Sequence, residues 1–300
     1  MNHMKNLSQE TIGEVFNIGA MLLWGMMPVL VRSSSGIVPP LFFSGSSIFL
    51  AGLVCFFVLM VQKKIGEIFC AAAFRDMMMS TLIISVLFYG VLFFAGQKTS
   101  AGNIAIIGQS EVVWTFMFFT LLGFEKLTLK KTLGAAVVVC GVLMIVIKSF
   151  SGDFVVWDFV LLLVFAITPL GNYFQKRALK RVSSITQLCF RSLVGGSLSL
   201  IASLIFERGH FTEASAVPIV VLVLLNGILA LGLSKIMFLE SLKRLEVSKT
   251  IAMGAAAPAV TMTAAYFILN EKPDILQLLG LALVVLGILV MINKSRSIRL

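Results

Sequence analysis

The chain has 300 residues, of which 59% are hydrophobic and 13% are charged, and its mean hydropathy is +1.02. These values lie far outside the range of soluble domains, so they exclude a water-soluble globular protein and indicate one that crosses a membrane many times. The formal net charge of +10 at pH 7 gives little reason to expect a nucleic-acid partner, because the basic residues are concentrated in short loops between apolar segments.

Apolar segments of roughly 17 to 25 residues, the length that crosses a bilayer as a helix, recur along almost the whole chain. They predict an all-α membrane protein with ten transmembrane helices, at residues 15–32, 40–62, 77–96, 101–122, 131–148, 157–175, 184–206, 217–239, 248–269 and 275–292. The longest gap, Lys63 to Asp76, has room for a short interfacial helix. No gap is long enough for a soluble domain, so any substrate site has to be built from the membrane helices.

The first apolar segment is preceded by a single lysine, Lys5, which is a weak basic region for a cleaved signal peptide. We therefore interpret this segment as the first transmembrane helix, and a signal peptide is the alternative.

The basic residues alternate between the two sides of the predicted membrane. If the amino terminus is cytoplasmic, 16 of the 24 Lys and Arg residues fall on inner segments, 5 fall on outer segments and 3 lie inside or at the edge of helices. This excess is the positive-inside signal. It predicts a multi-pass membrane protein with both termini in the cytoplasm, and we expect the membrane to be a bacterial inner membrane.

The fifth and tenth predicted helices match each other at an offset of 146 residues. Residues 124–147 read FEKLTLKKTLGAAVVVCGVLMIVI, and residues 270–293 read NEKPDILQLLGLALVVLGILVMIN. The first and sixth helices match more weakly, with Pro28 opposite Pro169 at an offset of 141. The sequence therefore predicts two five-helix repeats, residues 1–150 and 151–300, within one membrane domain.

Each repeat has five helices, which is an odd number, so the second repeat begins on the opposite side of the membrane from the first. The two copies therefore enter the membrane in opposite directions. Inverted repeats are typical of secondary transporters, in which two related bundles rock about a site near the bilayer midplane. A duplicated membrane scaffold or sensor that transports nothing is the alternative.

Several short motifs occur in order along the chain: Trp24-Gly25 and Pro28 in the first helix, Phe190-Arg191 in the seventh, Pro258 in the ninth, and the turns Glu125-Lys126 and Asn270-Glu271-Lys272, each followed by a Gly-x6-Gly helix. With these motifs the sequence resembles the drug/metabolite transporter superfamily and, within it, the ten-helix EamA-type transporters. The resemblance implies a carrier that exports or imports small metabolites such as amino acids, nucleobases, drugs or S-adenosylmethionine, usually by proton coupling or exchange. The family pattern has a proline near the centre of the fourth helix where this chain has Val112, so we expect that helix to be straighter than the ninth.

Glu111 lies in the apolar run AIIGQSEVVWTF (105–116), near the middle of the predicted fourth helix. An ionisable side chain at this depth cannot reach the interface and is a candidate functional group. We predict that Glu111 binds substrate and carries a coupling proton, since desolvation of a carboxylate favours reversible protonation near neutral pH. A structural glutamate, locked in a hydrogen bond with a neighbouring helix, is the alternative.

Two basic residues are candidate partners of Glu111 in the substrate site. Arg191 and Lys235 lie toward the predicted inner ends of the seventh and eighth helices, so both side chains can instead extend to the interface. If either faces Glu111, a substrate with amino and carboxylate groups can take the place of that pair, which favours amino-acid-like compounds. A cationic nucleoside-type metabolite such as S-adenosylmethionine, held by Glu111 and aromatic rings, is the alternative.

Other polar or aromatic residues at comparable depth are candidates to line a substrate cavity, namely Trp24, Tyr89, Gln109, Trp114 and Asn226. Three prolines interrupt helical hydrogen bonding and are candidate hinges or gates, namely Pro28, Pro169 and Pro258. The glycine pairs of the fifth and tenth helices allow close helix approach, either within the chain or between protomers of a homodimer.

The sequence has no phosphate-cradling GxxxxGK[ST], no HExxH and no paired CxxC motif, which are the usual signs of ATP hydrolysis or zinc chemistry. Its four cysteines show no ligand spacing. We therefore expect no cofactor, no bound metal and no enzyme activity, and an intramembrane enzyme is the weakest alternative. The predicted function is secondary transport of small organic metabolites, driven by a proton gradient or by exchange, with its direction left open.

Overall fold

In the computed structural model, which describes residues 8–124, 128–149, 155–208 and 216–292, every regular element is a helix. Eight helices are long and apolar enough to cross a membrane, and two shorter apolar ones follow, at Gly254–Leu269 and Ile275–Met291. The ten predicted helices are thereby confirmed. The third begins earlier than predicted, at Ala71, and the gap before it holds a short 3-10 helix, η2 (Ile65–Phe69).

The two halves of the chain have the same order of interrupted and continuous helices. The first half consists of α1 (Gln9–Trp24) and α2 (Met27–Ser33), α3 (Pro40–Val61), α4 (Ala71–Ser80) with η3 (Thr81–Phe88) and α5 (Tyr89–Gly96), α6 (Ala101–Gly108) and α7 (Ser110–Leu121), and α8 (Leu129–Ser149). The second half consists of α9 (Val155–Phe165) and α10 (Thr168–Ala178), α11 (Ser184–Phe206), α12 (Ala216–Leu224) with η4 (Leu225–Leu233) and α13 (Ser234–Arg244), α14 (Val247–Met253) with η5 (Gly254–Ala256) and α15 (Ala257–Leu269), and α16 (Ile275–Ile292).

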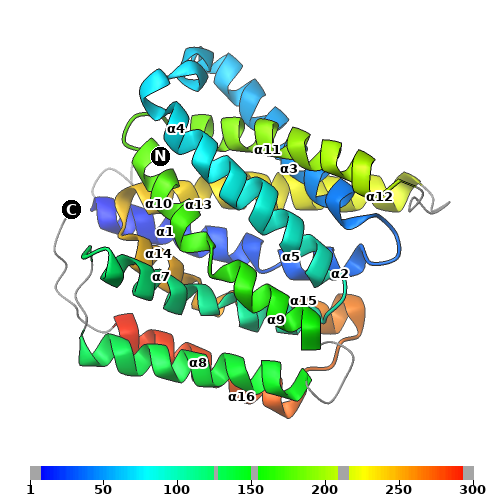
Figure 1. Ribbon diagram of the computed structural model, residues 1–300, viewed down its shortest axis with the longest axis vertical. Coiled ribbons are helices and arrows are strands. Elements are labelled where there is room, and N and C mark those ends of the chain that lie inside the picture. The colour runs from blue at the N-terminus through cyan, green and yellow to red at the C-terminus, as the bar shows by residue number, and fades with distance from the viewer. Residues whose placement is uncertain (1–7, 125–127, 150–154, 209–215, 293–300) are drawn as a thin grey trace.

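In each half the first and fourth spans are interrupted and the third contains a π-helical segment, η3 or η4. The second and fifth spans are continuous helices. The chain therefore folds as two inverted five-helix repeats. As Figure 1 shows, α1 begins and α16 ends on the same side of the molecule, and α8 and α16 lie side by side along one edge.

The two repeats pack against each other through equivalent helices. A methyl group placed on Gly134 would lie 2.5 Å from the carbonyl oxygen of Gly287, and one on Gly141 would lie 2.7 Å from that of Gly280. These contacts pair α8 with α16 in antiparallel orientation, and only glycine permits such close backbone approach. Both glycine pairs are thus used within the chain.

We expect replacement of Gly134 by valine to destabilise the protein by about 1–3 kcal/mol or more, because the added atoms meet backbone rather than a side chain that can move. Thermal unfolding in detergent checks this result. The control is Gly66→Val, since a methyl group at Gly66 meets nothing within 4 Å. Equal melting temperatures for the two variants would contradict the proposed close packing.

Proline accounts for three of the four helix interruptions. Pro28, Pro169 and Pro258 each stand at the start of the second helical piece of their span, where the missing N–H group removes a bond to the preceding turn. The fourth span lacks this proline but is also interrupted, at Gln109, where backbone bonds from Gln109 to Ile106 and from Val112 to Gln109 tighten the turn. The fourth span is thus interrupted at the single residue Gln109 and the ninth over the three residues of η5, and the straighter course of the fourth helix stays a prediction.

The central pair of continuous helices, α3 and α11, is capped reciprocally by glutamates. Glu207, after the end of α11, accepts hydrogen bonds from the N–H groups of Leu41 and Phe42 at 2.7 and 2.9 Å. Glu67 accepts from the N–H group of Ser183, before α11, at 3.1 Å. Partial burial acts to raise the pKa of Glu67, but hydrogen bonds from Thr186 and Ser183 outweigh it and leave that pKa below its ordinary value.

Candidate functional site

A cavity of about 110 Å³ lies where the interrupted helices of both repeats meet. Residues at or beside all four interruptions line it, including Gly25, Gln109, Thr168 and Gly254. The segments that follow the two π-helices supply further walls, with Tyr89 from α5 and Lys235 from α13. Discontinuous helices around a central site are the usual architecture of substrate sites in inverted-repeat transporters.

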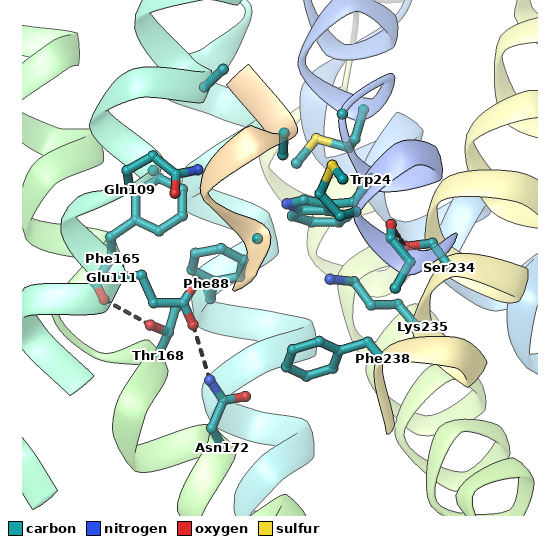
Figure 2. A pocket seen from close by; sticks show the side chains of 18 of the residues that line it. Trp24, Phe88, Gln109, Glu111, Phe165, Thr168, Asn172, Ser234, Lys235 and Phe238 are labelled. Atoms are coloured by element: carbon teal, nitrogen blue, oxygen red, sulfur yellow. Dashed lines mark hydrogen bonds between the residues drawn. The ribbon is translucent and has the colours of Figure 1, made fainter. Parts of the chain in front are cut away.

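Glu111 projects into this cavity from the first turn of α7. Its Oε1 atom accepts a hydrogen bond from Nδ2 of Asn172 on α10, at 2.9 Å. Figure 2 shows this bond and places Lys235 on the opposite wall, with its amino group directed into the space between them. One carboxylate and one ammonium group therefore face each other across the cavity.

A chain of hydrogen bonds connects Glu111 to Arg191 through two amides. Arg191 donates from Nη1 to Oε1 of Gln175 at 2.8 Å, and Gln175 donates from Nε2 to Oδ1 of Asn172 at 2.8 Å. Arginine is only a donor and a carboxylate is only an acceptor. The two ends therefore fix the direction of every bond in the chain, and Asn172 always presents its N–H₂ group to Glu111.

Lys235 lies over aromatic rings. Its Nζ atom is 3.3 Å from the centroid of the Trp24 ring and 5.3 Å from that of Phe238. The negative face of an aromatic ring stabilises an ammonium group, so these contacts stabilise a positive charge inside the membrane. Among the described residues no hydrogen-bond acceptor is found for this ammonium group, so its donors can serve a ligand.

The structure brings seven of the predicted residues to this cavity, namely Trp24, Pro28, Tyr89, Gln109, Glu111, Arg191 and Lys235. The other four do not line it. Asn226 is fully buried in η4, and Trp114 packs against the hydrophobic core from α7. Pro169 and Pro258 are also buried, each next to a lining residue, Thr168 or Ala257.

Sequence reasoning missed the polar face of α10. Thr168, Asn172 and Gln175 all line the cavity, and their spacing of four and three residues places them on one face of a helix. This spacing of three polar side chains along a predicted membrane helix was a usable signal. Asn17 of α1 was a comparable missed position, since a buried amide there also lines the cavity.

Polar contacts tie the interrupted helices together on both sides of the cavity. At the end where α1 begins, Asn17 donates from Nδ2 to the carbonyl oxygen of Thr250 at 2.7 Å. At the opposite end, Thr99 and Asn103 donate to the two carboxylate oxygens of Asp158 at 2.6 and 2.8 Å. The repeat offset of 141 relates Asn17 to Asp158, so the two contacts are equivalents in the two repeats.

Glu271 adds a contact at the same end as Asp158. Its carboxylate accepts from the N–H group of Ala101 at 3.0 Å and lies 3.7 Å from Nε of Arg32. Burial raises the pKa of Glu271 above its ordinary value, although both neighbours favour the charged form. Glu125, the repeat equivalent of Glu271, lies outside the described residues.

Ten membrane helices in two inverted repeats, with ionisable side chains facing a cavity between interrupted helices, are typical of membrane transporters. The chain belongs to the EamA-like transporter family, whose model matches residues 11–147 and again residues 155–293. It is a multi-pass membrane protein of a transporter family.

Curated relatives are bacterial transporters at low identity. The chain is 23% identical to the uncharacterized transporter YoaV of Bacillus subtilis over 90% of this chain and 93% of that protein. It is 25% identical to a protein of Escherichia coli named "Probable amino-acid metabolite efflux pump", over 89% of this chain and 90% of that protein. One crystal structure aligns with a TM-score of 0.73 and 18% identity, covering 96% of this chain and all of the other, which supports the fold alone.

Proposed function

We propose that this protein is a secondary carrier for small amphoteric metabolites, amino-acid-like compounds in particular. The observation that carries the proposal is the placement of Glu111 and Lys235 on opposite walls of one cavity at the helix interruptions. A substrate ammonium group pairs with Glu111 and a substrate carboxylate pairs with Lys235. The name of the Escherichia coli relative points to the same class of compound.

A cationic substrate such as S-adenosylmethionine fits this cavity less well. Two of the three charged side chains among the described lining residues are basic, namely Arg191 and Lys235. A net positive ligand would bring like charges together between membrane helices, where the dielectric constant is low, and this costs free energy. We therefore favour zwitterionic or acidic compounds.

We further propose that transport proceeds by alternating access. The cavity volume of about 110 Å³ is below the roughly 300–1,000 Å³ of typical ligand pockets, so substrate entry requires the helices around it to separate. The equivalent contacts of Asn17 and Asp158 then open in turn, one on each side of the membrane. Both termini lie in the cytoplasm in this proposal, as the positive-inside rule indicates.

Uptake into proteoliposomes of a pooled panel of labelled amino acids, nucleosides and S-adenosylmethionine tests the proposal. We expect amino acids to accumulate, and an imposed pH gradient or preloaded substrate to increase their accumulation. Dependence on the pH gradient identifies proton coupling, and dependence on preloading identifies exchange. Accumulation of S-adenosylmethionine alone, or of nothing with folded protein, would refute the proposed substrate class.

The hydrogen-bond chain predicts how Asn172 affects coupling. In the Asn172→Leu variant the Glu111 carboxylate loses the hydrogen bond from Nδ2 of Asn172, so the pH profile of uptake is expected to move toward higher pH. The other ionisable groups that line the cavity, Arg191, Lys235 and Tyr89, are unchanged in this variant. The measurement is initial uptake rate between pH 5 and 9.

The matched control for this prediction is Asn226→Leu. Asn226 is also a fully buried amide, its polar atoms have no partner among the described residues, and it does not line the cavity. Its replacement is expected to leave the pH profile in place. The same shift in both variants would show that Asn172 acts on stability alone.

A further inference from the structure

We infer that the preferred substrates are acidic amino-acid-like compounds, with two acid groups, one amino group and a net charge of −1. This inference rests on the proposed function and narrows its substrate class. Lys235 pairs with the first carboxylate and Glu111 with the ammonium group, as proposed above. Arg191 receives the second acid group.

Charge balance is the first argument. The three charged side chains among the described lining residues are Glu111, Arg191 and Lys235, so the cavity carries a formal charge of +1 when all are ionised. Uncompensated charge in a low-dielectric site is costly. A ligand with net charge −1 neutralises the cavity, whereas a zwitterion leaves the excess positive charge in place.

The unused donor of Arg191 is the second argument. Its side chain is 3% exposed and lines the cavity. One terminal nitrogen donates to Gln175, but Nε has no hydrogen-bond partner among the described residues. Buried polar groups are nearly always satisfied, and the planar guanidinium matches the geometry of a carboxylate or phosphate group. An acid group of a ligand that reaches Arg191 would supply the acceptor that Nε lacks.

The position of Arg191 relative to Glu111 is the third argument. The two residues do not form a direct ion pair, because Asn172 and Gln175 stand between them in the hydrogen-bond chain. These two amides keep the guanidinium of Arg191 and the carboxylate of Glu111 apart. Arg191 can then bind an acid group, and Glu111 an amino group, at different places on one ligand.

The test compares amino acids of similar size and different charge in reconstituted wild-type protein: L-glutamate (net −1), L-glutamine (neutral) and L-lysine (net +1). Competition against the substrate identified from the pooled panel gives their relative affinities. We expect L-glutamate to compete at least ten-fold better than L-glutamine and L-lysine to compete worst. If L-glutamine or L-lysine competes as well as L-glutamate, the inference is overturned while the proposed carrier function stands. If nothing in the panel is transported, the proposed function fails.

Variants of Arg191 assign the role to that side chain. Arg191→Lys, which keeps the charge, is expected to retain a preference for L-glutamate over L-glutamine. Arg191→Gln is expected to lose the preference for L-glutamate over L-glutamine. An unchanged preference in folded Arg191→Gln would refute the assignment. If that variant does not fold, the wild-type charge series decides the inference.

Discussion

Replacing Glu111 by glutamine is expected to reduce net substrate accumulation by about 10- to 100-fold. The glutamine side chain fills the same space but cannot bind an ammonium group as an ion pair or release a proton. Loss of one charge-assisted contact costs about 1.5–3 kcal/mol, and each 1.4 kcal/mol is a factor of ten in an equilibrium constant. The measurement is concentrative uptake into proteoliposomes under an imposed pH gradient.

Substrate exchange without a gradient separates the two roles of Glu111. If the residue only carries the coupling proton, Glu111→Gln retains exchange and loses accumulation. If it also holds the substrate ammonium group, as we propose, both are lost. Normal accumulation in the variant would mean that Glu111 is a structural residue.

Glu207 supplies the matched control for this experiment. Like the half-buried Glu111, the buried Glu207 accepts hydrogen bonds from neighbouring groups, but it caps α3 and does not line the cavity. We expect Glu207→Gln to lower the melting temperature and to leave transport per folded molecule unchanged. A loss of transport in both variants would point to a general effect of removing a buried carboxylate.

Much of the fold could be predicted from the sequence because the bilayer imposes strong constraints. Apolar segment length fixes the helices, and the match between Gly134/Gly141 and Gly280/Gly287 reveals the repeat. The close contacts of these same glycines show that the repeat signal reflects packing. The interruption at Gln109 could not be predicted from a proline rule, since local backbone bonds produce it.

The site was less predictable than the fold, because the depth of a residue in the membrane can be estimated only if the end of its helix is predicted correctly. The apolar pattern ended the eighth helix near residue 239, so Lys235 was expected near the interface. In the structure α13 continues through Arg244, because its last turns pack against α1 and no longer need to be apolar. Lys235 then lies deep enough to face the cavity. Which helices meet there follows from tertiary packing that the local pattern does not contain.

Replacing Lys235 by glutamine is the second change with a large expected effect. We expect the KM for a carboxylate-bearing substrate to rise by about 10- to 100-fold, because the substrate carboxylate loses its charged partner. The same variant should lose discrimination between an amino acid and the corresponding amine without a carboxylate. Both quantities come from the concentration dependence of uptake and its inhibition by the amine.

Lys98 provides a control with the same local chemistry. Its Nζ atom lies 4.0 Å from the centroid of the Phe94 ring and 3.9 Å from that of Trp157, and it does not line the cavity. Lys98→Gln therefore removes a lysine from aromatic rings without touching the proposed site, and its KM should match wild type. Equal KM values for both variants and wild type would contradict a carboxylate-binding role for Lys235. A rise in KM for Lys235→Gln with none for Lys98→Gln would therefore be due to the lost substrate contact and not to the loss of a lysine from aromatic rings.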